Sequence, residues 1–193
     1  EPFVFKGFKE VFDETVKNHF CNIITNGTMF KEKTIQHIIT AEKLKVLSVS
    51  IDEVYNKNRD VKDWQWQQML RGLEIFHKLK LSRNTDISLD IKAVIMDENA
   101  EKLFELNKYA FEVLNADTVS FSFLKGSNIQ HSDYEVKFDS IYKTYEAPVY
   151  NKFDTIKDQI NMIREYNEKN SKNSFLHPNI FKINNTEKKM DID

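Results

Sequence analysis

The sequence predicts an α/β protein that forms part of a TIM-like (β/α) barrel, with parallel strands and helices on the outside. Three observations predict this fold class. Helical and strand patterns alternate along the chain, the connections between strands are long enough for helices, and three of the strands have one apolar and one polar face. The 193 residues are 40% hydrophobic, which is enough for one sizeable core and favours a single domain.

Four amphipathic helices are predicted in the first part of the chain, because apolar side chains recur three and four positions apart. These side chains form four groups: Phe8, Val11, Phe12 and Val16; Ile35, Ile38 and Ile39; Trp66, Met69, Leu70 and Leu73; and Leu103, Leu106, Ala110, Val113 and Leu114. A fifth helix is predicted from the same spacing of Phe153, Ile156, Ile160 and Ile163.

Runs rich in Val, Ile, Phe and Thr predict four strands, at about residues 21 to 25, 45 to 51, 87 to 95 and 118 to 124. A helix-length segment separates each strand from the next. Such crossovers are typical of parallel strands, whereas hairpins need only short turns. The chain also has only four glycines, which are too few for a hairpin-rich all-β fold.

The last three of these strands alternate between apolar and polar residues, so each has one polar face. Parallel sheets normally bury both faces, and a barrel explains the polar face if helices cover the outside and the polar side chains line a lumen. The predicted lumen residues are Ser48, Ser50, Asp52, Ser88, Asp90, Lys92, Ser120 and Ser122. A lumen of hydroxyls and charges would be a ligand cavity. The alternative is an open sheet with a solvated face.

A polar turn, Thr25-Asn26-Gly27-Thr28, directly follows the first strand. In barrels of parallel strands, ligands bind at the carboxyl ends of the strands, so this turn and Ser50-Ile51-Asp52 lie at the predicted binding end. Gly27 suits a turn that needs positive φ, and Asn26 offers both a donor and an acceptor. An Asn-Gly pair by itself is more often only a turn.

The last third of the chain predicts less structure. Residues 168 to 174 are polar and predict a loop, Phe175 to Pro178 begin one more short strand, and residues 184 to 193 are predicted to form a frayed tail. We therefore expect one partial barrel domain over residues 1 to 193. Its core β/α units occupy residues 1 to 124, and residues 125 to 193 form a C-terminal extension with one helix and a tail.

Composition excludes several classes of function. With 28 basic and 30 acidic residues and a net charge of -2, the chain has no basic surface for nucleic acid or an anionic membrane. No apolar run approaches the roughly 20 residues of a membrane helix, and the N-terminal residues lack a signal-peptide pattern, so a cytoplasmic location is expected. The five histidines are scattered without metal-ligand spacing and predict no metal site.

Five further residues have structural predictions. Cys21, at the start of the first strand, is predicted to be a buried structural cysteine. Trp64 and Trp66 are predicted to pack in the core. Ser120 and Ser122 are predicted to be lumen hydroxyls rather than nucleophiles, because no Gly-x-Ser-x-Gly elbow surrounds them.

Several sequence elements occur in the order of the motifs of the radical SAM enzyme family. Glu1-Pro2 resembles the end of the family's Gly-Gly-Glu-Pro motif, Thr25-Asn26-Gly27 its Thr-Asn-Gly turn, and Ser50-Ile51-Asp52 its Ser-x-Asp-Gly segment. Asp97-Glu98-Asn99 then opens another helix, as in the family. The likeness covers residues 1 to 124. The Gly-Gly pair and the family's Cys-x-x-x-Cys-x-x-Cys loop have no counterpart in this sequence.

The resemblance implies cofactor-binding roles for five residues. Glu1 matches the acidic residue that helps to hold the amino group of S-adenosylmethionine, and Asn26 matches the turn near that cofactor. Ser50 and Asp52 match residues near its ribose. Arg59 matches the arginine of the family's His-Asp-x-x-Arg-Gly segment, although its neighbours depart from that pattern and a glutamate follows Asp52 where the family usually has glycine.

The resemblance also implies a reaction. In the family, three cysteine thiolates hold a [4Fe-4S] cluster, the cluster cleaves S-adenosylmethionine reductively, and the resulting 5'-deoxyadenosyl radical abstracts hydrogen from the substrate. This chain has a single cysteine. We therefore expect a fragment of such an enzyme, inactive by itself and binding neither cofactor alone, whereas the intact protein would use both.

The expected partners of the intact enzyme are an electron donor and a peptide or small-metabolite substrate. The exposed sheet edges of a partial barrel also predict self-association or partial disorder of the fragment. The alternative hypothesis is a non-catalytic α/β protein that uses the polar face of the sheet to bind a small ligand or to regulate another protein.

Overall fold

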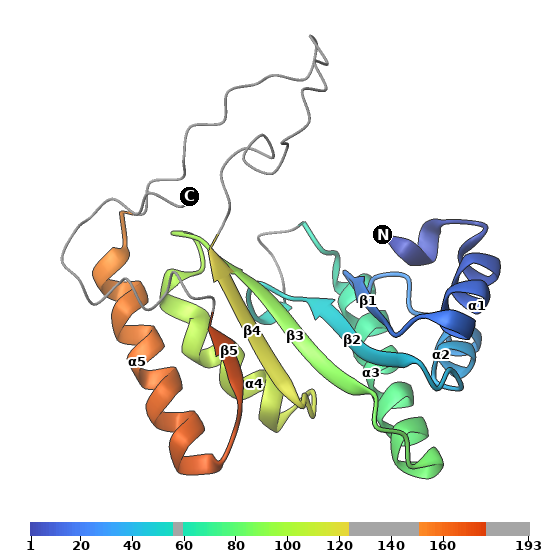
Figure 1. The fold of residues 1–193 in the computed structure, drawn as a ribbon. Coiled ribbons are helices and arrows are strands. Elements are labelled where there is room, and N and C mark those ends of the chain that lie inside the picture. Colours follow the sequence, from blue (N-terminus) through green and yellow to red (C-terminus); the bar gives the residue numbers. More distant parts are fainter. Residues whose placement is uncertain (56–59, 124–150, 177–193) are drawn as a thin grey trace, which may run out of the picture.

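The structure is a computed structural model that describes residues 1–55, 60–123 and 151–176 (Figure 1). It is a mixed α/β fold with a five-stranded parallel sheet. Its helices are η1 (Pro2–Val4), α1 (Phe8–Asn18), α2 (Glu32–Ile38), α3 (Asp63–Arg83), η3 (Ala100–Lys102), α4 (Leu103–Glu112) and α5 (Phe153–Asn170). Its strands are β1 (Cys21–Thr25), β2 (Leu44–Ser50), β3 (Ser88–Ile95), β4 (Thr118–Phe123) and β5 (Ser174–Leu176).

Every strand lies beside the strand that precedes it in the chain, in the order β1-β2-β3-β4-β5. When right-handed crossovers always step in the same direction, they put the connecting helices on one face of the sheet. Figure 1 shows α3 and α4 behind the strands. Among the described residues, the opposite face of the sheet therefore carries no helix.

One hydrophobic core fills the space between the sheet and its helices. The helix-facing residues Leu47, Ile91 and Val119 are 0% exposed. All of the α-helices contribute buried side chains to this core, for example Phe12, Ile35, Trp66, Leu106 and Ile156. The parallel pairing and the apolar face predicted from the sequence are both confirmed.

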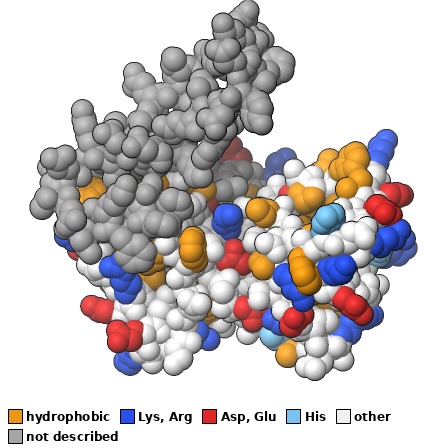
Figure 2. All heavy atoms as spheres, in the orientation of Figure 1, with side chains coloured by type: hydrophobic (Ala, Val, Ile, Leu, Met, Phe, Trp, Pro, Cys, Tyr) orange, Lys and Arg blue, Asp and Glu red, His pale blue; other side chains and the backbone are white. Residues whose placement is uncertain are grey.

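The other face of the sheet is polar. Two neighbouring rows of the strand register hold Ser48, Asp90 and Thr118, and then Ser50, Lys92 and Ser120. Ser48 and Asp90 are buried, and the other four side chains are partly exposed. Figure 2 looks onto this side of the molecule, where the middle is mostly white, with a basic and an acidic patch close together. The alternation predicted for these strands is thus present in the fold.

The C-terminal part differs from its prediction in one respect. The polar residues 168 to 170 continue α5 to Asn170 instead of forming a loop, and Ser171 ends the helix in the left-handed region with φ 51°. Their polarity reflects solvent exposure and not a break in the helix. The short strand predicted near Phe175 is confirmed as β5, which pairs in parallel with β4. The predictions for residues 125 to 149 and 184 to 193 lie outside the described residues.

Trp64 and Trp66 have opposite environments. Trp66 is 2% exposed and belongs to the core, as predicted, whereas Trp64 is 58% exposed, so its predicted core position is wrong. Residues two positions apart on an α-helix point in directions about 200° apart. The side of α3 that carries Trp66 faces the sheet, so Trp64 points away from it. Val11 and Val113 are likewise more exposed than their helical spacing predicts.

Within the described ranges, none of the helices combines the length and the apolar character needed to cross a bilayer.

Candidate functional site

The turn after β1 is fixed by its own side chains. Asn26 Oδ1 accepts hydrogen bonds from Thr28 N (3.0 Å) and Thr28 Oγ1 (2.7 Å), and Gly27 N donates to Thr25 Oγ1 (3.0 Å). Gly27 has φ +72°, and a Cβ atom there would lie 2.6 Å from Met69 Cγ. Backbone conformation and packing both require glycine at this position.

Glu1 joins this turn. Its Oε1 accepts hydrogen bonds from Thr25 Oγ1 (2.7 Å) and Phe3 N (3.3 Å), and its Oε2 accepts one from Asn26 N (2.8 Å). The structure therefore brings together Glu1 and Asn26, which belong to two separate elements of the family resemblance. The result is an exposed carboxylate at the carboxyl end of β1, held in place by three donors.

Ser50 and Asp52 lie at the carboxyl end of β2. Ser50 is partly exposed, whereas Asp52 is 1% exposed. Asp52 Oδ1 accepts a hydrogen bond from Val94 N (2.8 Å), so this carboxylate joins the end of β2 to β3. Asp52 thus has a structural contact in addition to the ribose-binding role that the resemblance implies.

Asn99 is a buried residue of this region, and the only signal for it in the sequence is the resemblance of Asp97-Glu98-Asn99 to the family pattern. Its Nδ2 donates to Asp52 O and Val94 O, both at 2.8 Å, and its Oδ1 accepts from Met96 N (2.9 Å). Asn99 is 0% exposed. It therefore holds the chain after β2 against the chain after β3, and no periodic pattern in the sequence could reveal this contact.

Glu53 occupies the place where the family usually has glycine. Its side chain is buried and forms an ion pair with Lys102 Nζ of η3. The hydrogen bond with Glu53 raises the pKa of Lys102 above its usual value. The departure from the family pattern thus supplies a bridge between the end of β2 and η3. Arg59 lies outside the described residues.

The carboxylate of Asp90 is the centre of a hydroxyl cluster on the polar face. Its Oδ1 accepts hydrogen bonds from Thr118 Oγ1 and Ser120 Oγ, both at 2.8 Å, and its Oδ2 accepts one from Ser48 Oγ (3.0 Å). Three strands are therefore linked through one carboxylate. The strand alternation predicts Asp90, Ser48 and Ser120 on this face but does not single out Thr118, because a threonine at the start of a strand is not distinctive.

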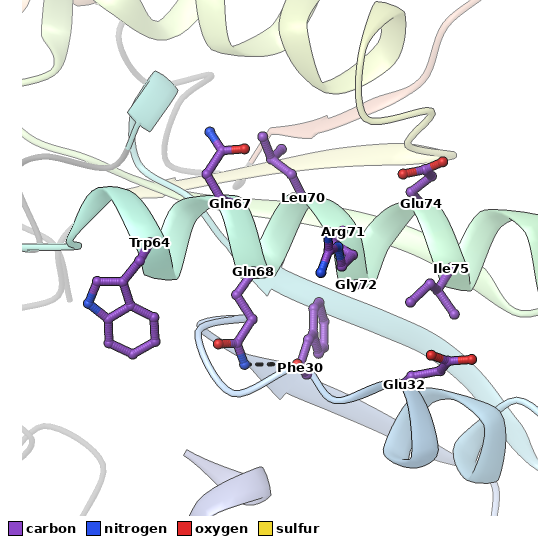
Figure 3. A pocket seen from close by; sticks show the side chains of 10 residues that line it. All are labelled: Phe30, Glu32, Trp64, Gln67, Gln68, Leu70, Arg71, Gly72, Glu74 and Ile75. Atoms are coloured by element: carbon purple, nitrogen blue, oxygen red, sulfur yellow. Dashed lines mark hydrogen bonds between the residues drawn. The ribbon is translucent and has the colours of Figure 1, made fainter.

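Two grooves in the described part of the chain are lined by other residues. One has a volume of about 840 Å³ and lies along α3, where Trp64, Gln68 and Glu74 line it (Figure 3). Gln68 Nε2 donates to Phe30 O at 2.9 Å on its wall. The other, about 350 Å³, is mainly apolar and lies between α1 and the open edge of β1. Neither groove contains Glu1, Asn26, Ser50 or Asp52.

The donor set of the chain does not fit a [4Fe-4S] cluster. Such a cluster needs three thiolates at one iron-sulfur centre, and the sequence has only Cys21. Cys21 is partly buried, less than predicted, and burial raises the pKa of its thiol, which disfavours the thiolate. Within the described residues, no group of three or more His, Cys, Asp or Glu side chains could hold a metal ion.

Comparisons with known proteins add no family to this description. No protein-family model matches the chain. A search of the curated proteins also finds no match.

Proposed function

We propose that this chain is the S-adenosylmethionine-binding part of a radical SAM enzyme. The observation that carries the proposal is the contact between Glu1 and Asn26. These residues match two different motifs of the family, 25 positions apart in the chain, and they meet at the carboxyl end of β1. Ligands of parallel α/β folds bind at that end of the strands.

The strand order supports a barrel fragment as the scaffold. A doubly wound sheet reverses its strand order and carries helices on both faces, whereas the order β1-β2-β3-β4-β5 keeps its crossovers on one face. Within a TIM-like (β/α) barrel, the polar face would line the lumen. The row of Ser50, Lys92 and Ser120 would then be close to the ligand.

The proposed roles follow from the chemistry of the side chains. The carboxylate of Glu1 would accept hydrogen bonds from the amino group of S-adenosylmethionine, which charge assistance makes strong. The hydroxyl of Ser50 and the carboxylate of Asp52 would bind the ribose hydroxyls. Asn99 and Glu53 hold the end of β2 in place through their contacts with Asp52 O and Lys102.

Under this proposal, cysteines that are not part of this sequence would bind the cluster, because the single cysteine of this chain cannot bind it. When bound in the intact enzyme, the cluster would supply the electron for reductive cleavage of S-adenosylmethionine. The chain's own contribution is to bind and orient that molecule. The substrate, a peptide or a small metabolite, and the electron donor would be partners of the intact enzyme.

The test uses the product of the full reading frame, reconstituted anaerobically with iron and sulfide. We expect dithionite to yield 5'-deoxyadenosine from S-adenosylmethionine. Ser50→Ala should lower kcat/KM for S-adenosylmethionine about tenfold, since one hydrogen bond to the ligand is lost and a buried partner is left unpaired. The matched control is Ser88→Ala, which removes a hydroxyl from the same sheet face at the opposite end of β3 and should leave the rate unchanged.

Failure to bind a cluster and to form 5'-deoxyadenosine would overturn the proposal. The non-catalytic ligand-binding protein would then be the better hypothesis. Equal losses in Ser50→Ala and Ser88→Ala would overturn the assignment of the carboxyl end as the binding site.

A further inference from the structure

Lys92 is a basic residue in the middle of the polar face. It lies on β3 between Ser50 of β2 and Ser120 of β4 in the strand register. Its side chain is partly exposed, and within the described parts of the chain it forms no hydrogen bond and no ion pair. A lysine that is partly removed from water without a counterion carries an uncompensated desolvation cost.

Asp90 does not act as this counterion. It lies two residues earlier on β3 and therefore on the same face, roughly 6 to 7 Å away along the strand. Its carboxylate instead accepts hydrogen bonds from Ser48, Thr118 and Ser120. The three hydroxyls thus supply the hydrogen bonds of the Asp90 carboxylate. The positive charge of Lys92 has no direct partner among the described residues.

Ser122 supplies a second donor beside Lys92. It is paired with Val94, one row closer to the carboxyl ends of the strands than the row of Lys92 and Ser120. Its side chain points to the same face, because residues two apart on a strand do so. Among the described residues its hydroxyl has no hydrogen-bond partner.

We propose that Lys92 and Ser122 form a binding site for an oxyanion, namely a carboxylate or phosphate group of a small-molecule ligand. An ammonium group only donates hydrogen bonds and a hydroxyl can donate one, so the complementary ligand atom is an acceptor. The positive charge favours an anionic acceptor. The site goes beyond the proposed function, because it requires an anionic group on the ligand and depends on neither the cluster nor S-adenosylmethionine.

The experiment titrates the 193-residue chain, containing lysine labelled with ¹³C at Cε, with sodium phosphate and separately with sodium acetate, both at constant ionic strength. Lys92→Met identifies the Lys92 signal by its loss. We expect this signal to shift along a saturable curve with at least one of the two anions, and the tighter anion distinguishes phosphate from carboxylate. Lys33, which is exposed on α2, should show only a small linear shift.

Three variants locate the site. Ser122→Ala should raise the Kd of the anion about threefold or more, because one donor is lost, whereas Ser88→Ala on the same face should leave it unchanged. Asp90→Asn should lower the Kd about two- to fivefold, because a like charge near the anion is removed. Circular dichroism spectra of the variants should match that of the unmodified chain.

A linear shift of Lys92 equal to that of Lys33 would overturn the proposal, as would equal effects of Ser122→Ala and Ser88→Ala. Because the probes are simple anions, this result is independent of 5'-deoxyadenosine formation. Saturable binding in a protein that makes no 5'-deoxyadenosine would keep the anion site and remove the proposed function.

Discussion

The two faces of the sheet use alternate residues of the same strands, but they are built for different purposes. On the helix side, side chains such as Leu47 and Ile91 are fully buried in one core. On the other side, hydroxyls and charges bind one another around Asp90. A sheet needs the first set in order to fold. The second set costs free energy to desolvate, so its presence calls for a ligand or a specific polar contact.

The comparison teaches where function can be sought in this molecule. Apolar burial accounts for nearly everything on the helix side, where the residues follow from packing alone. On the polar side, the contacts of Asp90 explain Ser48, Thr118 and Ser120 but not Lys92 and Ser122. The residues that folding does not explain are therefore the better candidates for ligand binding.

The largest expected effect separates the two faces directly. Ile91→Ala should lower the free energy of unfolding by roughly 2–5 kcal/mol, because it leaves a cavity in a fully buried site. Ser122→Ala, on the polar face of the next strand, should change it by less than about 0.5 kcal/mol. Urea denaturation followed by circular dichroism measures both. Comparable losses in the two variants would mean that the polar face is also part of the folding core.

Asn99 lies at the carboxyl end of the sheet, and its substitution tests how much the hydrogen bonds there stabilise the fold. Asn99→Ala removes the donors to Asp52 O and Val94 O and the acceptor of Met96 N. Each buried group left unpaired costs roughly 1–3 kcal/mol, so we expect a clear loss of stability in urea. Asn161→Ala is the control, because Asn161 is an exposed asparagine in the middle of α5. An equally stable Asn99→Ala protein would show that water replaces these contacts.

Sequence patterns could predict the strands, their parallel order and the alternation of faces because each depends on local periodicity. The same periodicity misplaced Trp64, since a helical stripe does not say which of two nearby tryptophans faces the sheet. The contact between Glu1 and Asn26 could be expected only from a family resemblance, because these residues are distant in the chain. The bonds of Asn99 and Thr118 depend on tertiary geometry, which no spacing records.

The hydroxyl cluster gives a smaller effect on the polar face. Ser48→Ala removes the hydroxyl that donates to Asp90 Oδ2 and should lower the free energy of unfolding by about 1 kcal/mol. Ser88→Ala, a serine of the same face without a contact to Asp90, should be nearly neutral. Urea midpoints of the two variants give the comparison. Equal midpoints would indicate that Asp90 is satisfied by its remaining hydroxyls.

Asp97 gives the smallest expected effect, and only in acid. Partial burial favours the neutral acid, but hydrogen bonds from Asn151 N, Lys152 N and Asn151 Nδ2 outweigh it and lower the pKa of Asp97. A carboxyl group whose pKa is lower in the folded state stabilises the fold above its unfolded pKa of about 3.9. This contribution disappears as the pH falls through the lower, folded-state pKa.

Asp97→Asn should therefore be less stable than the unmodified chain at pH 7, and the difference should shrink as the pH falls below about 4. Urea titrations at several pH values measure it, with Glu98→Gln, an exposed neighbour, as the control. A difference that is constant with pH would show that Asp97 acts through the shape of its hydrogen bonds and not through its charge. The contact between the end of β3 and the start of α5 would then stabilise the fold through its geometry, as the apolar contacts do on the helix-covered face of the sheet.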